Sequence, residues 1–179
     1  ALASTAQKIT EQRFLGHMSD GFRALDKNRF TDATEAFEQA GSVYRDNPAV
    51  AQALAQVETR RSQLWVSNRI AEAAELETQE KWQQALEVYK KLLAKDGTLT
   101  DVRVKQIPVT VRADLDTRIK KALSDPLALS AINQFRRGQK VIQDAIGIRN
   151  PGPVLQQQIA ELRQVLKASQ TPIQVLLTS

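Results

Sequence analysis

Residues 30–37 read Phe-Thr-Asp-Ala-Thr-Glu-Ala-Phe, and residues 82–89 read Trp-Gln-Gln-Ala-Leu-Glu-Val-Tyr. The two stretches lie 52 residues apart (82 − 30). They share an aromatic residue, an alanine three positions later and a second aromatic residue four positions after that. These spacings place all three side chains on one face of an α-helix. Each stretch follows a turn with a basic residue, so each predicts the second helix of a hairpin in which the alanine permits close helix contact.

Helices are also expected before and after these two stretches. The first is expected over residues 4–27, and another begins at Pro48 with Asn47 as its cap. Whether residues 48–80 form one helix or two stays open, because residues 58–63 contain no apolar side chain. Beyond Gly97 we expect a short helix over residues 99–107 that ends at Pro108, with strand as its alternative. Helices over residues 111–122, 129–146 and 155–166 are expected to follow.

The end of the chain has strand character over residues 171–178, although no other convincing strand is apparent. A lone strand does not satisfy its own backbone groups, so this one is expected to lead into a missing β-domain or to join a sheet elsewhere. We therefore predict helical hairpins with a long central helix over residues 1–97, further packed hairpins over 98–170, and an orphan strand over 171–179. A helical module that leads into a small β-domain also suggests a membrane-tethered bacterial envelope protein, in or facing the periplasm.

The repeated pattern resembles the tetratricopeptide repeat. The resemblance covers about residues 12–96 and departs from the family in two ways: the repeats are 52 residues apart instead of about 34, and Ala73 stands where the family has a small glycine-like position. It implies a scaffold of helical hairpins for protein–protein contact, usually through a concave groove. The matching residues are Gly21, Phe30, Ala33, Phe37 and Ala40 in one hairpin, and Trp82, Ala85 and Tyr89 in the other.

The side-chain inventory argues against catalysis. The chain has no cysteine and a single histidine, His17, so thiol nucleophiles, disulfides and the usual zinc sites lack their ligands. Paired carboxylates occur only where exposed helix faces are expected, and there they are more often solubilising. We expect no enzyme activity, no cofactor and no metal. No apolar run approaches the roughly 18 residues that a membrane-spanning helix needs.

Two groups of residues are candidate binding surfaces. Phe14, Met18, Phe22 and Leu25 form one apolar stripe on the first helix, which is either core or a groove for a partner's helix or extended peptide. The second group is basic. Residues 101–179 hold 12 Lys and Arg against 6 Asp and Glu, whereas residues 1–100 hold 13 against 14. The basic clusters either keep the domain soluble, which is the favoured interpretation, or form one anion-binding patch if their two helices lie side by side. The residues are Arg118, Lys120, Lys121, Arg136, Arg137 and Lys140.

These observations predict an all-α protein, with hairpins stacked as a tetratricopeptide-like α-solenoid and a short C-terminal strand. The expected function is a non-catalytic protein-interaction or scaffolding module of a larger, bacterial protein. One alternative is an architectural spacer or dimerisation arm that forms an oligomer through the long helix. Another is the binding of an anionic polymer by the basic half. Nucleic acid is the less favoured partner, because Phe135 is the lone aromatic residue near the basic clusters.

Overall fold

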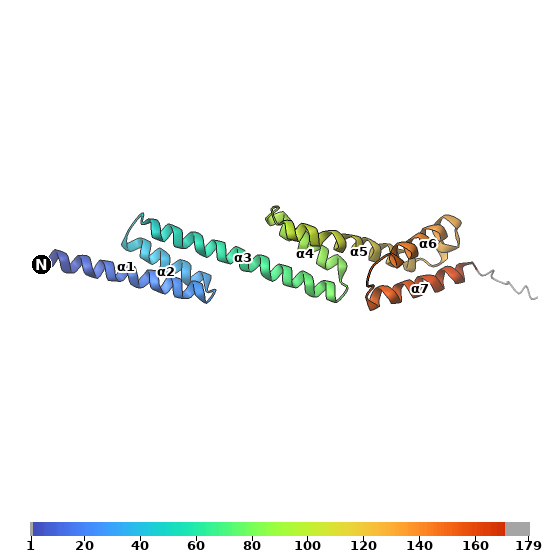
Figure 1. Cartoon of the computed structure of the whole chain (residues 1–179), viewed down its shortest axis with the longest axis horizontal. Helices are drawn as coiled ribbons and strands as arrows, with labels where there is room; N and C mark the ends of the chain where they lie inside the picture. The colour runs from blue at the N-terminus through green and yellow to red at the C-terminus, as the bar shows by residue number, and fades with distance from the viewer. Residues whose placement is uncertain (1, 171–179) are drawn as a thin grey trace, which may run out of the picture. The chain divides into compact units, whose positions relative to one another are not determined.

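The computed structural model describes residues 2–170 and is all-helical over that range (Figure 1). The all-α prediction is therefore confirmed for the described residues. The strand expected over residues 171–179 lies outside them. In chain order, the elements are α1 Leu2–Asp26, α2 Phe30–Val43, α3 Pro48–Thr78, α4 Trp82–Lys95, α5 Thr100–Ser124, the 3-10 helix η1 Leu127–Ser130, α6 Ile132–Ile146 and α7 Pro153–Ser169.

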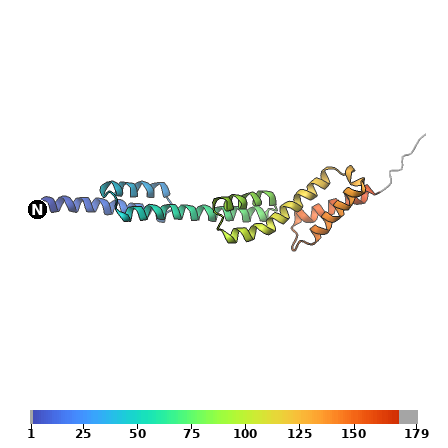
Figure 2. The ribbon, with the colours of Figure 1, turned by 90° about the horizontal axis from the view of Figure 1, so that it is seen from above.

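The chain divides into two compact units, and the division falls within α3. Unit 1 extends to Asn68 and unit 2 begins at Arg69. Helices α4 and α5 pack against each other and both belong to unit 2, so the division between the units lies within α3 and not near residue 97 (Figure 2). The C-terminal part of α3 joins them, since the Tyr89 hydroxyl on α4 donates a hydrogen bond of 2.6 Å to Glu77.

The long central segment is one helix, which answers the question that the sequence left open. Asn47 caps it as expected, because the Asn47 side-chain oxygen accepts a hydrogen bond of 2.9 Å from the backbone N–H of Ala49. Residues 58–63, which lack apolar side chains, are all exposed to solvent. The polar stretch is therefore the solvent-facing part of a continuous helix and hides no turn.

The expected break at Pro108 is absent, and this prediction is wrong. Pro108 lies inside α5, which runs without interruption from Thr100 to Ser124. A proline in a helix interior removes one backbone hydrogen bond and costs about 3 kcal/mol. The helix continues in spite of that cost, and Val102 and Val109 on either side of Pro108 are each no more than 2% exposed.

The two hairpins built from the repeated pattern have the same turn. Asn28 and Glu80 have left-handed backbone angles, with φ of 56° and 53°. In both turns the backbone N–H of the next residue bonds a carbonyl five positions earlier: Arg29 to Ala24 at 2.9 Å, and Lys81 to Leu76 at 2.8 Å. The helices that follow, α2 and α4, are both 14 residues long.

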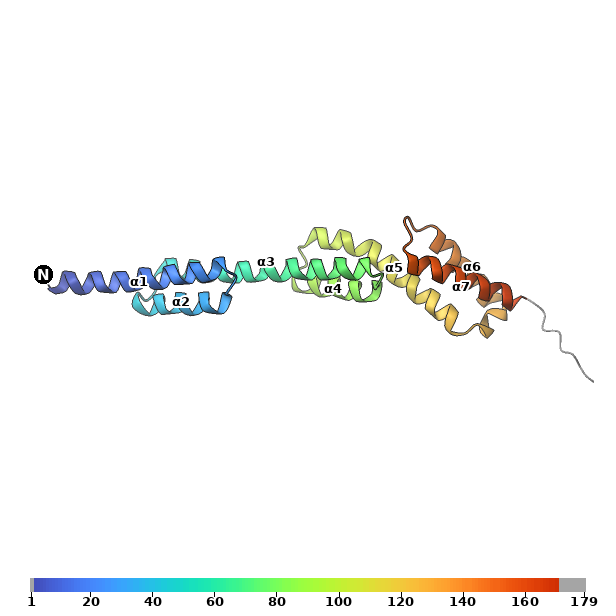
Figure 3. The ribbon, with the colours of Figure 1, turned by 90° about the horizontal axis from the view of Figure 1, so that it is seen from below.

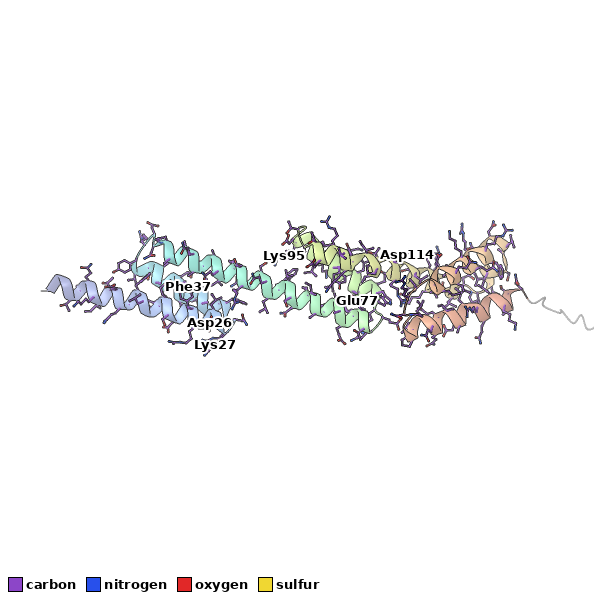
Figure 4. The ribbon with its side chains drawn as sticks, viewed as in Figure 1. Asp26, Lys27, Phe37, Glu77, Lys95 and Asp114 are labelled. Carbon is purple, nitrogen blue, oxygen red and sulfur yellow. The ribbon has the colours of Figure 1, made fainter. Side chains whose placement is uncertain are left out.

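Unit 1 is built around Phe37, which is fully buried between α1, α2 and the N-terminal half of α3 (Figure 4). Helices α1 and α2 lie side by side (Figures 2 and 3). Their close approach depends on Gly21, because a Cβ added there would overlap the Phe37 ring. Ala33 and Ala40 on α2 are also fully buried, as the hairpin prediction requires.

The C-terminal core of unit 2 joins α5, η1, α6 and α7. Ile119 on α5 and Leu162 on α7 are fully buried in it. Helix α6 packs on α7 (Figure 3), and Leu129 lies in η1 instead of in the expected helix over 129–146. The prediction missed η1 because its turn is short and its sequence is apolar.

A buried ion pair connects the α3–α4 turn with α5 and α7. Glu80 and Arg112 lie 3.1 Å apart, and their side chains are 7% and 9% exposed. The other bonds of Glu80 go to the start of α7, where its carboxylate accepts the backbone N–H groups of Val154 at 2.9 Å and Leu155 at 3.3 Å. One carboxylate therefore neutralises a cation and caps a helix N-terminus more than 70 residues away.

Candidate functional site

A groove of about 660 Å³ lies in unit 1 between the end of α1 and the middle of α3. On the α1 side it is bordered by Phe22, Leu25 and Asp26, the last of which is labelled in Figure 4. Phe22 is 40% exposed, and its ring rests edge-on against Phe37 with centroids 5.0 Å apart. The α3 side contributes Gln52, Ala55, Gln56, Thr59, Arg60 and Gln63.

The structure separates the four residues of the predicted apolar stripe. Met18 and Leu25 are 8% and 5% exposed and belong to the core of unit 1. Phe14 packs against that core, with its ring edge-on to Tyr44 at 5.2 Å. Phe22 alone of the four is exposed, and with Leu25 it borders the groove. The stripe is thus core over most of its length and groove at its C-terminal end.

Sequence reasoning missed the polar wall of this groove. Gln52, Gln56 and Gln63 lie at spacings of four and seven residues, which places them on one face of α3. Within residues 2–170 none of the three side chains makes a hydrogen bond. The spacing of the glutamines was visible in the sequence, but the presence of α1 across from them was not.

A second concave site lies in unit 2 between α5, η1 and α6, with a volume of about 500 Å³. Two cationic side chains come from α5 and two from α6. Its floor is apolar, with Leu129 and Val141 buried beneath it. We call this site the basic pocket. Its charged lining residues are Arg118, Lys121, Asp125, Arg137 and Lys140.

Four of the six residues of the predicted anion patch therefore line one pocket. The condition for the patch was that the two helices be neighbours, and α5 and α6 do contact each other. The remaining two residues lie elsewhere. Lys120 is bonded to Asp116 at 2.7 Å on another face of α5, and Arg136 is exposed on α6 without lining the pocket.

Arg118 is held at the pocket wall by acidic neighbours. It donates a hydrogen bond of 2.7 Å to Asp144 on α6, and Asp114, labelled in Figure 4, lies 3.5 Å away. The hydrogen bond to Asp144 raises the pKa of Arg118, and the attraction of both carboxylates adds to this effect. Lys121, Arg137 and Lys140 form no ion pair with any described residue. Most of the positive charge of the basic pocket is thus uncompensated.

Neither site contains the single histidine of the chain. His17 is half-buried on α1 and lines neither the groove nor the basic pocket. Among residues 2–170, no group of three or more histidine, aspartate or glutamate side chains is arranged to hold a metal ion. No described helix combines the length and the apolar character that crossing a membrane requires.

Comparison of the chain with protein-family models, with curated proteins and with solved structures gives no match.

Proposed function

We propose that the chain is a non-catalytic protein-interaction scaffold that carries two tetratricopeptide-like hairpins, and that unit 1 binds a segment of a partner protein in the groove between α1 and α3. The observation that carries the proposal is the groove itself. It combines an exposed aromatic ring, Phe22, with three glutamine side chains that have no partner in the described part of the chain. The absence of catalysis stays a prediction.

The local geometry of the hairpins supports the tetratricopeptide-like interpretation. In the first hairpin, Gly21 lies directly against the ring of Phe37, which is the close contact that a small residue permits. In the second, Ala73 and Tyr89 stand at the same separation of 16 residues (37 − 21, 89 − 73), and they are fully or almost fully buried. The turns match as well, since Asn28 and Glu80 share the left-handed conformation.

The chemistry of the groove favours an extended peptide as its occupant. A glutamine side chain carries both a donor and an acceptor, which is the combination that a peptide backbone offers in return. Gln52, Gln56 and Gln63 repeat that combination along the wall of α3, and Phe22 adds an apolar contact for one side chain. We expect main-chain hydrogen bonds to supply affinity and the contact at Phe22 to select an apolar residue.

Display of a random peptide library against the immobilised full chain tests this proposal. A peptide that is enriched is then synthesised and titrated against the parent and a Gln56→Ala/Gln63→Ala variant. Alanine maintains the helix, so the fold is expected to survive. The loss of two hydrogen bonds, each worth about 1 kcal/mol, should weaken binding on the order of tenfold or more.

A matched control is Gln12→Ala/Gln39→Ala, which removes two exposed glutamines outside the groove. This control is expected to bind the peptide as the parent does. Enrichment of no peptide at all, or equal loss of binding in both double variants, would contradict the proposed function.

A further inference from the structure

The basic pocket of unit 2 differs from an ordinary solvated surface in the balance of its charges. Its lining carries four cations and one carboxylate, that of Asp125. A surface cation on a helix can pair with an acidic residue three or four positions away, as Lys120 does with Asp116. Lys121 and Lys140 each have an aspartate four residues on, Asp125 and Asp144, but neither forms an ion pair with it, and Arg137 forms none with any described residue. The charge is available to a ligand.

The cations stand in two short rows. Arg118 and Lys121 are three residues apart on α5, and Arg137 and Lys140 are three residues apart on α6, so each pair shares a helix face. The apolar floor includes Leu129 and the half-buried side chains of Ala122 and Ala128.

We propose that the basic pocket binds an acidic peptide segment of a partner protein, in which carboxylates flank an apolar side chain. The carboxylates meet the cations of α5 and α6, and the apolar side chain covers the floor. Arg137 offers a planar group that pairs with a carboxylate through two parallel hydrogen bonds. Arg118 has five donor hydrogens, of which the bond to Asp144 uses one, so it remains able to bind a further carboxylate.

The surroundings of the pocket favour a peptide over other anions. Among residues 2–170, no aromatic side chain lines it, so these residues give nucleic-acid bases no ring on which to stack. Its volume of about 500 Å³ is larger than a single inorganic anion needs, and such an anion would leave the apolar floor uncovered. Leu127, in the same 3-10 turn as the floor residue Leu129, is 84% exposed and offers apolar contact to a longer ligand.

This site uses residues of unit 2 alone, so it does not depend on the groove of unit 1. A partner could bind either site without the other, and the two proposals fail independently. Substitutions in the groove are expected to leave the affinity of the basic pocket unchanged.

Fluorescence anisotropy with the full chain tests the proposal. The probe is a short fluorescein-labelled peptide in which Asp and Glu alternate with Leu. We expect saturable binding that a Lys121→Gln/Arg137→Gln variant weakens by about tenfold or more, since the loss of pairing charges in a partly desolvated site raises the off-rate. A peptide with Asn and Gln in place of the acids should not bind.

The matched control is Lys105→Gln/Arg136→Gln, which removes the same charge from exposed positions on the same two helices outside the pocket. Its affinity should stay within about twofold of the parent, because rim charges act mainly through screened, long-range attraction. If both double variants weaken peptide binding equally, binding depends only on the net charge of the protein, and the proposal is overturned.

Two further probes distinguish the ligand class. These are a single-stranded oligonucleotide and vesicles that contain phosphatidylglycerol. Tighter binding of either one than of the acidic peptide, lost in the Lys121→Gln/Arg137→Gln variant, would overturn the peptide as the ligand. Weak binding of both, unaffected by that variant, supports it. No binding of the acidic peptide by the parent at low salt also overturns the proposal.

Discussion

Replacement of Glu80 by alanine should destabilise unit 2 more than any change at an exposed position. The Glu80 carboxylate pairs with Arg112 at 3.1 Å and accepts two backbone N–H groups at the start of α7. Burial lowers the pKa of Arg112, while Glu80 and Asp116 oppose that shift. Both side chains of the pair are thus largely shielded from solvent.

The expected size of the effect follows from these contacts. Removal of one partner of a buried ion pair costs about 3–5 kcal/mol, because the remaining charge is left without compensation. Asp116 still attracts Arg112 after the substitution, which places the cost at the lower end of that range. Loss of the cap on α7 adds about 1 kcal/mol. We expect Glu80→Ala to lower the free energy of unfolding by about 4 kcal/mol in total.

The chain contains a matched control for the backbone effect. Asn28 occupies the equivalent turn of the first hairpin with φ of 56°, and its side chain is exposed. Asn28→Ala and Glu80→Ala both keep a residue with a Cβ in the left-handed conformation, so the cost of that conformation, about 1 kcal/mol, is present before and after each substitution. The difference between the two variants therefore measures the contacts of the Glu80 side chain.

Urea unfolding followed by circular dichroism gives the stabilities, and hydrogen exchange over residues 153–159 reports on the first turns of α7. Glu80→Ala should accelerate exchange there, whereas Asn28→Ala should not. If the two variants lose equal stability and exchange in α7 is unchanged, the ion pair and the cap contribute nothing measurable and the reasoning is refuted.

Three further predictions concern single positions, each checked by the same urea unfolding. Gly21→Ala should lower the free energy of unfolding by about 1–3 kcal/mol, because the added methyl group meets the Phe37 ring. Gly16→Ala, which has open space around it, should raise that free energy by up to about 1 kcal/mol. Equal effects of the two substitutions would contradict the packing argument. Burial and a hydrogen bond to the carboxylate of Glu77 raise the pKa of Tyr89 in the folded state. The contribution of neutral Tyr89 to stability is therefore complete below the unfolded-state pKa of about 10 and is lost as the pH rises further. In the Tyr89→Phe variant, the free energy of unfolding should fall less as the pH rises above about 10. The same pH profile in parent and variant would show that ionisation of Tyr89 does not cause the fall. Pro108→Ala should raise stability by about 1–3 kcal/mol by restoring a backbone hydrogen bond, and a lower stability would show that the proline ring itself contributes packing.

The paired hairpins could be predicted from the sequence because their determinants are local. Alanine and aromatic spacing marks the buried face, and turn residues mark the boundaries, so α2 and α4 begin at Phe30 and Trp82 where the pattern begins. Local rules failed at Pro108. Helix α5 continues through this proline while residues on either side of it are buried, and short-range sequence patterns carry no information about such packing.

The candidate sites, too, were predictable from the sequence only in part. The apolar stripe on α1 was visible, but hydrophobicity alone could not distinguish Met18, which is buried in the core, from Phe22, which faces the groove. The basic character of the C-terminal half was also visible. Only the packing of α6 on α5 selected Arg118 and Arg137 for one pocket and left Arg136 outside it.

By itself, the sequence determined the helical class, the duplicated hairpin and the excess of positive charge, because these depend on residue type and on spacings within a few turns of helix. The tertiary structure alone decided which cations share a pocket, that Gln56 faces α1, and that Glu80 caps α7. Those contacts join residues far apart in the chain. Their geometry depends on how whole helices pack. The residues around Glu80 in the sequence therefore do not indicate that its carboxylate will cap α7.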